Sequence, residues 1–171
     1  MKQFLIVALL LLAGCATQSP APARYDALAP AWEPRLTQSL HKMRAAASAT
    51  ANGFLFITAH DAPQDPGYFL QCTYSVEEDV TLCEAAAPEK HPEITPVLRP
   101  GFRETLTALG FDTSHADPHY QLLYELDADP TLDKLGGVLL HALVDAYGFG
   151  AEGQLIFHVG TVPRGEEGPA P

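Results

Sequence analysis

Histidine and aspartate side chains gather in one short stretch of the chain, where they could hold a metal ion. His115 and His119 are four residues apart, with Asp112 and Asp117 beside them, and these are ligand types that suit zinc. Residues i and i+4 share a side only on a helix, and Pro118 disfavours a helix at this place. Polar residues of a loop between a helix and a strand would explain the same composition. The pair is therefore only a weak metal candidate, and we expect no cofactor.

A second chemical possibility is a histidine base with an orienting carboxylate. His60 and Asp61 stand next to each other at the end of an apolar run. Neighbouring residues on a strand point to opposite faces, so the two side chains cannot pair simply there. None of the serines that follow Cys15 lies in a Gly-x-Ser-x-Gly turn. We recognise no catalytic set, and the sequence favours a protein that is not an enzyme.

Two cysteines have the spacing of a disulfide across a hairpin. Residues 68–76 alternate between apolar and polar, as in a strand, and the acidic residues 77–79 suit a turn. Residues 80–85 would then form the second strand of a hairpin. Folding about that turn places Cys72 opposite Cys83, where the Cα atoms of paired residues are about 4.5–5.5 Å apart. The pair has neither a Cys-x-x-Cys spacing nor a basic neighbour that would lower a thiol pKa. We therefore predict a structural disulfide and not a redox centre.

Apolar periodicity and stop signals predict the other elements. Helices are expected over residues 33–49, with Pro34 at the first position, over 100–109, and over 130–147. Strands are expected over residues 54–58, 120–126 and 155–159. The run 54–58 is continuously apolar, which is typical of a strand covered on both sides. Gly136 and Gly137 interrupt the last helix, and close packing against the sheet would explain them.

These elements define the expected fold class. Their order is α-β-β-β-α-β-α-β, and we predict an α+β domain with a mixed, mainly antiparallel sheet of about five strands. Two to three helices should pack on this sheet. The helix that crosses between the last two strands permits one parallel pair.

The first fifteen residues have the layout of an export signal. Residues 1–3 carry a positive charge, and residues 4–12 form an apolar stretch shorter than the roughly 20 residues that span a bilayer. Leu12, Ala13, Gly14 and Cys15 follow. This layout resembles the lipobox signal peptide of bacterial lipoproteins, and the resemblance covers residues 1–15.

The resemblance implies a lipid anchor. In this family the cysteine, here Cys15, is diacylated, the peptide is cut before it, and the new N-terminus is usually acylated, so the partner would be a lipid bilayer. Ala16 in place of Asp favours transport to the outer membrane, facing the periplasm. The alternative is an ordinary signal peptide cut nearby, which would leave Cys15 as a thiol.

This organisation divides the chain into four parts. Residues 1–14 are the expected signal peptide, and residues 15–30 carry the lipidated cysteine and an Ala/Pro-rich tether. Residues 31–160 form a single α+β domain. Residues 161–171, rich in Pro, Gly and Glu, are an expected disordered tail.

Charge and composition limit the classes of function that the chain could have. The formal charge of −11 argues against binding of nucleic acid. An anchor, a tether and a small domain without a catalytic set favour an accessory protein that binds another envelope protein, with strand addition at a sheet edge as one possible mode. The alternative is a binder of a small ligand or metal that uses His115, His119 and the aromatic residues Tyr68, Phe69, Tyr74, Tyr120 and Tyr124.

Overall fold

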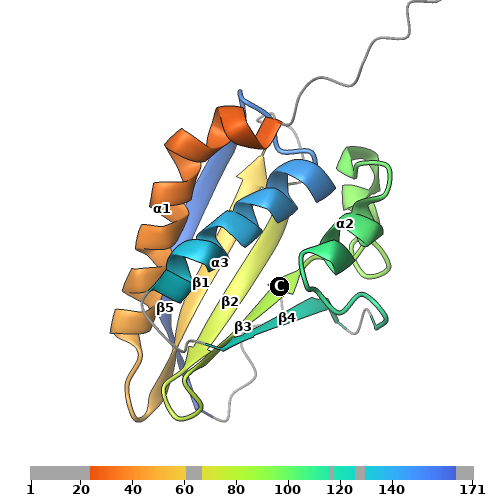
Figure 1. Ribbon diagram of the computed structural model, residues 1–171. Helices are drawn as coiled ribbons and strands as arrows, with labels where there is room; N and C mark the ends of the chain where they lie inside the picture. Colours follow the sequence, from red (N-terminus) through yellow and green to blue (C-terminus); the bar gives the residue numbers. More distant parts are fainter. Residues whose placement is uncertain (1–23, 61–66, 116–117, 126–129, 165–171) are drawn as a thin grey trace, which may run out of the picture.

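A single five-stranded sheet organises the protein. The computed structural model describes residues 24–60, 67–115, 118–125 and 130–164 (Figure 1). The helical elements are α1 (Arg24–Ala46), η1 (Pro92–Val97), α2 (Phe102–Ala108), α3 (Pro130–His141) and η2 (Ala142–Ala146), η1 being a 3₁₀-helix and η2 a π-helix. The strands are β1 (Ala51–His60), β2 (Tyr68–Ser75), β3 (Val80–Ala85), β4 (Tyr120–Glu125) and β5 (Gln154–Pro163).

The strands lie in the order β4-β3-β2-β1-β5, and each neighbouring pair is antiparallel. The predicted α+β class and the predicted order of elements are confirmed. The parallel pair that the crossing helix permits does not form among the described strands, because β5 returns beside β1 and not beside β4. β4 and β5 are therefore the two edges of the sheet.

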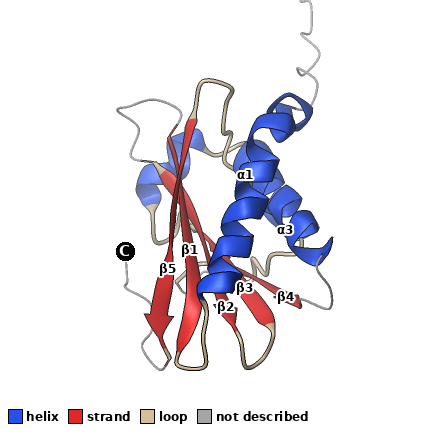
Figure 2. Cartoon of the chain, turned by 90° about the vertical axis from the view of Figure 1, so that its left-hand side faces the viewer, coloured by secondary structure: helices blue, strands red, loops and turns tan. Residues whose placement is uncertain are grey.

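The two long helices lie together on one side of the sheet (Figure 2). Their buried leucines, among them Leu36 and Leu135, meet side chains of the strands such as Leu55 and Leu70, and all four are fully buried. η1 and α2 complete this core at one end, where α2 packs against η2. None of the described helices is long and apolar enough to cross a bilayer.

The first helix begins earlier than the sequence predicts. α1 starts at Arg24 and contains both Pro30 and Pro34, so the prediction of a tether over residues 15–30 is wrong for residues 24–30. Tertiary contacts outweigh the two prolines: Leu28 is buried in the core, and the ring of Tyr25 stacks on that of His141 with centroids 3.5 Å apart. Cys15 and the signal region lie outside the described residues.

The glycine pair of α3 marks the crossing of the two helices and not a contact with the sheet. A Cβ atom at Gly136 would lie 2.6 Å from Oγ1 of Thr37, which is on α1. A Cβ atom at Gly137 would lie 3.4 Å from the hydroxyl oxygen of Tyr25 and 3.5 Å from Oε1 of Glu33. Close packing explains the two glycines, as expected from the sequence, but α3 packs closely against α1 here and not against the sheet.

The last strand is longer than predicted. β5 extends to Pro163, so residues 161–163 belong to the sheet and not to the expected tail. Its ten residues pair with β1 along their whole length. The predicted hairpin of β2 and β3 is confirmed, as is the predicted helix α2. At the end of α2 the backbone N–H of Phe111 donates to the carbonyl of Leu106.

Candidate functional site

The predicted disulfide is present and belongs to the core. Cys72 and Cys83 are opposite each other in the register of β2 and β3, are bonded, and are both fully buried. Their Cα atoms are 4.0 Å apart, as suits a pair of residues that do not exchange backbone hydrogen bonds. The bond closes the hairpin on the side that the helices cover, where it stabilises the fold.

The two histidines weighed as metal ligands lie in different surroundings, and Asp117 of the same stretch lies outside the described residues. Nδ1 of His115 lies 2.8 Å from Oγ of Ser114, and His115 is exposed. His119 is 3% exposed and lies beside His91, with the ring centroids 5.4 Å apart. Among the described residues, no three His, Cys, Asp or Glu side chains are placed to hold one metal ion. His91 gave no signal in the sequence because it lies in an irregular, proline-rich segment.

His119 is held as a neutral ring in an aromatic cluster. The rings of His91 and His119 both meet Phe69 edge-on at 5.2 Å. Nδ1 of His119 is buried without a hydrogen-bond partner. Burial lowers the pKa of His119, His91 adds to this effect, and the carboxylate of Glu84 opposes it. The cluster covers one end of the sheet on the side away from the helices.

The aromatic residues predicted to line a groove are mostly core residues. Tyr68, Tyr74 and Tyr120 are at most 5% exposed. The hydroxyl of Tyr120 donates to Glu89 at 2.8 Å and accepts from Arg103 at 2.9 Å, and burial with the Glu89 contact raises its pKa to about 12. Their burial fits core packing and not the alternative of a ligand groove, because the even-numbered residues of β2 and β4 face the helices.

One histidine has the orienting carboxylate that general base catalysis uses. Nδ1 of His141 lies 2.8 Å from Oδ2 of Asp145, one helical turn away, and both side chains are more than a third exposed. The ring of His141 stacks on Tyr25, whose hydroxyl donates to Glu33 at 2.9 Å. Neither contact supplies a nucleophile, and the arrangement joins α1 to α3. His60 ends β1, and Asp61 lies outside the described residues.

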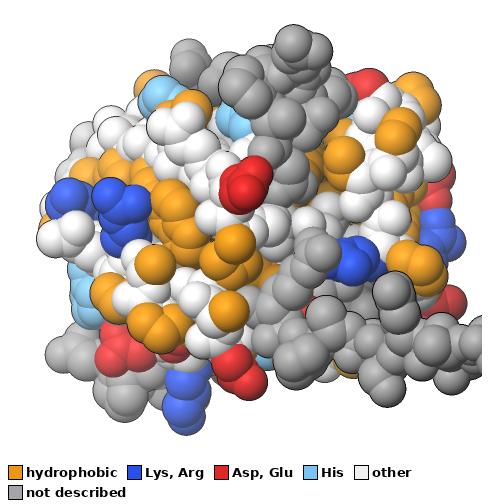
Figure 3. Space-filling model, turned by 90° about the horizontal axis from the view of Figure 1, so that it is seen from above, with side chains coloured by type: hydrophobic (Ala, Val, Ile, Leu, Met, Phe, Trp, Pro, Cys, Tyr) orange, Lys and Arg blue, Asp and Glu red, His pale blue; other side chains and the backbone are white. Residues whose placement is uncertain are grey.

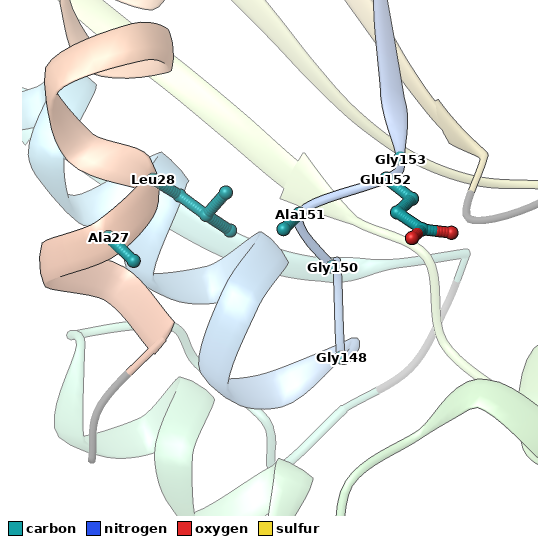
Figure 4. Close-up of a pocket in the computed structure, with 7 residues that line it drawn as sticks. All are labelled: Ala27, Leu28, Gly148, Gly150, Ala151, Glu152 and Gly153. Atoms are coloured by element: carbon teal, nitrogen blue, oxygen red, sulfur yellow. The ribbon is translucent and has the colours of Figure 1, made fainter. Parts of the chain in front are cut away.

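The hollow next to the start of α1 is shallow and mostly apolar. It has a volume of about 480 Å³ and lies between Ala27 and Leu28 of α1 and the loop 148–153. Leu28 points toward Ala151, whereas the carboxylate of Glu152 points away from the helix (Figure 4). Seen from above, hydrophobic side chains gather in a band at this end of the molecule (Figure 3). A single carboxylate gives this hollow no means to orient a polar ligand.

The strongest candidate is the side of the sheet that faces away from α1 and α3, which we call the outer face. The register aligns its side chains in rows, and one row runs from Gly160 through Phe54 and Thr73 to Leu82 and Leu123. The apolar members of this outer face include Phe54, Phe56, Leu82, Leu123 and Ile156. Leu123 is 62% exposed and Ile156 is 37% exposed.

This apolar outer face has no cover in the described part of the chain beyond the end where the histidines contact Phe69. Phe54, Phe56 and Leu82 are partly exposed, and a Cβ atom at Gly160 would have no atom within 4 Å. The outer sides of antiparallel sheets are usually polar, since alternation places apolar residues inward. This apolar outer face is therefore the strongest candidate for a binding surface among the described residues.

The outer face carries acidic side chains at one edge. Glu84 and Glu125 point outward from β3 and β4, and Glu84 accepts hydrogen bonds from Gln71 at 2.6 Å and Gln121 at 3.3 Å. Arg164, beyond the end of β5, is already paired with Glu77 at 2.7 Å. A surface that fits this face would be apolar with basic side chains beside Glu84 and Glu125.

The comparisons with family models, curated proteins and solved structures found no match. The chemistry of the candidate site consists of an apolar sheet surface with an acidic edge, beside a core closed by a disulfide.

Proposed function

We propose that this protein is a lipid-anchored accessory protein of a bacterial cell envelope, and that its outer face binds another envelope protein. The observation that carries the binding function is the apolar outer face itself. Residues 54–57 are apolar on both sides of β1, yet the two long helices α1 and α3 cover only one side (Figure 2). Binding of a protein surface would remove Phe54, Phe56 and Leu123 from water.

The anchor and the domain would lie close together. The lipobox-like sequence supports acylation of Cys15, and eight residues separate Cys15 from Arg24, where α1 begins. A fully extended chain of this length places the start of α1 within about 30 Å of the bilayer. The domain would therefore bind partners that lie at or near the same membrane surface.

The partner should carry apolar and basic side chains. Apolar contact would provide most of the affinity at Phe54 and Phe56, and basic groups would pair with Glu84 and Glu125 at the rim. Such rim pairs mainly set association rate and specificity, so capture should weaken as salt rises.

Photo-crosslinking in cells tests this proposal. A photo-reactive amino acid replaces Leu123 on the outer face or, as the matched control, Gln38 on the exposed side of α1. We expect a crosslinked product of one defined mass from position 123 and not from position 38. Cys15→Ser should reduce its yield, because that variant lacks the acylated thiol.

Two results would refute the proposal. One is a folded protein that gives no crosslinked product at Leu123 or at a second outer-face position, Phe56. The other is the same product from Gln38 in equal yield, which would indicate random collision. Formation of the Cys72–Cys83 disulfide reports that each variant is folded.

A further inference from the structure

The two edges of the sheet differ in how they could accept another strand. The edge of β4 is short, and Asp112 already pairs with it through Gln121, the two residues exchanging both backbone hydrogen bonds. β5 is longer and, in the part of the chain that the structure describes, pairs only with β1. Figure 2 looks onto the molecule from the side where β5 lies in front.

The direction of each backbone group of β5 follows from the register. The N–H of Arg164 donates to the carbonyl of Thr50, so the even-numbered residues of β5 bond to β1. The odd-numbered residues then point their N–H and C=O groups away from the sheet. These outward residues are Leu155, Phe157, Val159 and Thr161, followed by Pro163, which has a carbonyl but no N–H.

The edge of β5 has none of the features that normally prevent strand pairing. Edge strands are usually protected by charged side chains, a bulge or an internal proline. β5 has no Asp, Glu, Lys or Arg, its register with β1 is continuous, and its proline is the last residue. Val159 and Ile156 are 38% and 37% exposed, on opposite faces of the strand.

We propose that two copies of this chain pair through β5, antiparallel and about a two-fold axis at Val159, so that their sheets join. In this register Phe157 of one copy pairs with Thr161 of the other, and Val159 pairs with itself. On the outer face Ile156 meets Val162, and His158 meets Gly160, where there is open space.

Charge complementarity favours a second copy over an unrelated strand. Arg164, which pairs with Glu77 of its own chain, directly follows β5, and Glu152 lies two residues before β5, so an antiparallel second copy brings Glu152 near this existing ion pair. Diagonal neighbours are within reach of long side chains. The two-fold axis repeats this contact, so both ends of the paired strands bring an acid beside a base. The pairing does not depend on the function proposed for the outer face.

Disulfide trapping of the whole membrane-anchored chain tests the pairing. Val159→Cys places two thiols across the two-fold axis, at the Cα separation of about 5.5 Å that suits a disulfide. We expect a covalent dimer on mild oxidation. The matched control is Leu123→Cys on the edge of β4, which should give little dimer although Leu123 is more exposed.

A backbone variant separates strand pairing from random collision. Thr161→Pro in the Val159→Cys chain removes an N–H that points away from the sheet and leaves the bonds to β1 intact. We expect at least about tenfold less dimer, since two symmetric bonds are lost. Thr161→Ala retains the N–H and should trap dimer as before.

The results separate this pairing from the alternatives. No dimer from Val159→Cys, equal dimer from Leu123→Cys, or an unchanged yield with Thr161→Pro would each overturn the proposal. A photo-crosslinked partner at the outer face together with no β5 dimer would leave the proposed function standing and remove the pairing alone.

Discussion

Two glycines of neighbouring strands allow a direct test of which face of the sheet is covered. Gly53 of β1 lies on the side of the helices, and Gly160 of β5 lies on the outer face, one register position away. A Cβ atom at Gly53 would overlap the carbonyl oxygen of Met43 and lie 2.9 Å from its carbonyl carbon. A Cβ atom at Gly160 would touch nothing within 4 Å.

Opposite effects on stability follow for the two alanine variants. In Gly53→Ala, the new Cβ atom and the carbonyl carbon of Met43 need about 3.5–4.0 Å between them. The C-terminal end of α1 must therefore move about 1 Å away from β1. Overpacking of this kind costs about 1–3 kcal/mol, and the upper value applies here because the atoms in contact are backbone. In Gly160→Ala the reduced freedom of the unfolded chain should stabilise by about 0.5 kcal/mol.

Urea denaturation of both variants, followed by circular dichroism with the disulfide intact, measures this difference. We expect the free energies of unfolding to differ by about 3.5 kcal/mol, or about 10 °C in melting temperature for a domain of this size. A Gly53→Ala chain as stable as the wild type would refute the close approach of α1. A Gly160→Ala chain destabilised by more than about 1 kcal/mol would show that something covers the outer face.

Three further predictions concern the core and its polar contacts. Replacing Cys72 and Cys83 together with Ala opens a loop of about 12 residues and should cost about 3 kcal/mol, and an unchanged urea midpoint would contradict the entropic argument. Burial lowers the pKa of His119, so its contribution to stability is complete above the usual pKa of 6.5 and is lost as pH falls below it. His119→Phe should therefore flatten the pH dependence of the urea midpoint in this range, and an equally steep dependence would count against a neutral ring. Tyr25→Phe removes the bond to Glu33 and should cost about 1 kcal/mol at neutral pH. Because burial, with this bond, raises the pKa of Tyr25 to about 12, the stability advantage of wild type should fall to zero and then reverse as pH rises from 10 through 12, as measured by thermal melts.

The sequence predicted correctly those elements whose structure is determined by residues close together in the chain. The alternation about Cys72 and Cys83 predicted the hairpin and its disulfide, and apolar periodicity predicted α2 and α3. The start of α1 was missed because Pro30 and Pro34 argue for a break. Only contacts from α3 and the core, at Tyr25 and Leu28, stabilise the earlier turns.

The candidate site was missed for a different reason. The apolar run 54–58 predicted a strand covered on both sides, and that interpretation holds for one side only among the described residues. Whether an apolar side chain is covered depends on the strand order and on the side that the helices choose, and neither can be read from one strand. His91 and His119 likewise meet only because Phe69 lies between their segments.

The outer face and the edge of β5 use different atoms of the same strand. Strand pairing would use the backbone of Phe157, Val159 and Thr161, whose side chains lie on the side of the helices. The outer face is built from the even-numbered residues, such as Ile156, whose backbone groups already bond to β1. Pairing at β5 would therefore leave the outer face of each copy free. It would place the outer faces of the two copies side by side on one continuous sheet. A partner that contacts both copies would bind with an effective concentration in the millimolar range for its second contact. Thr161→Pro should then weaken capture of such a partner without changing any side chain of the outer face, which would separate two linked sites from a single one.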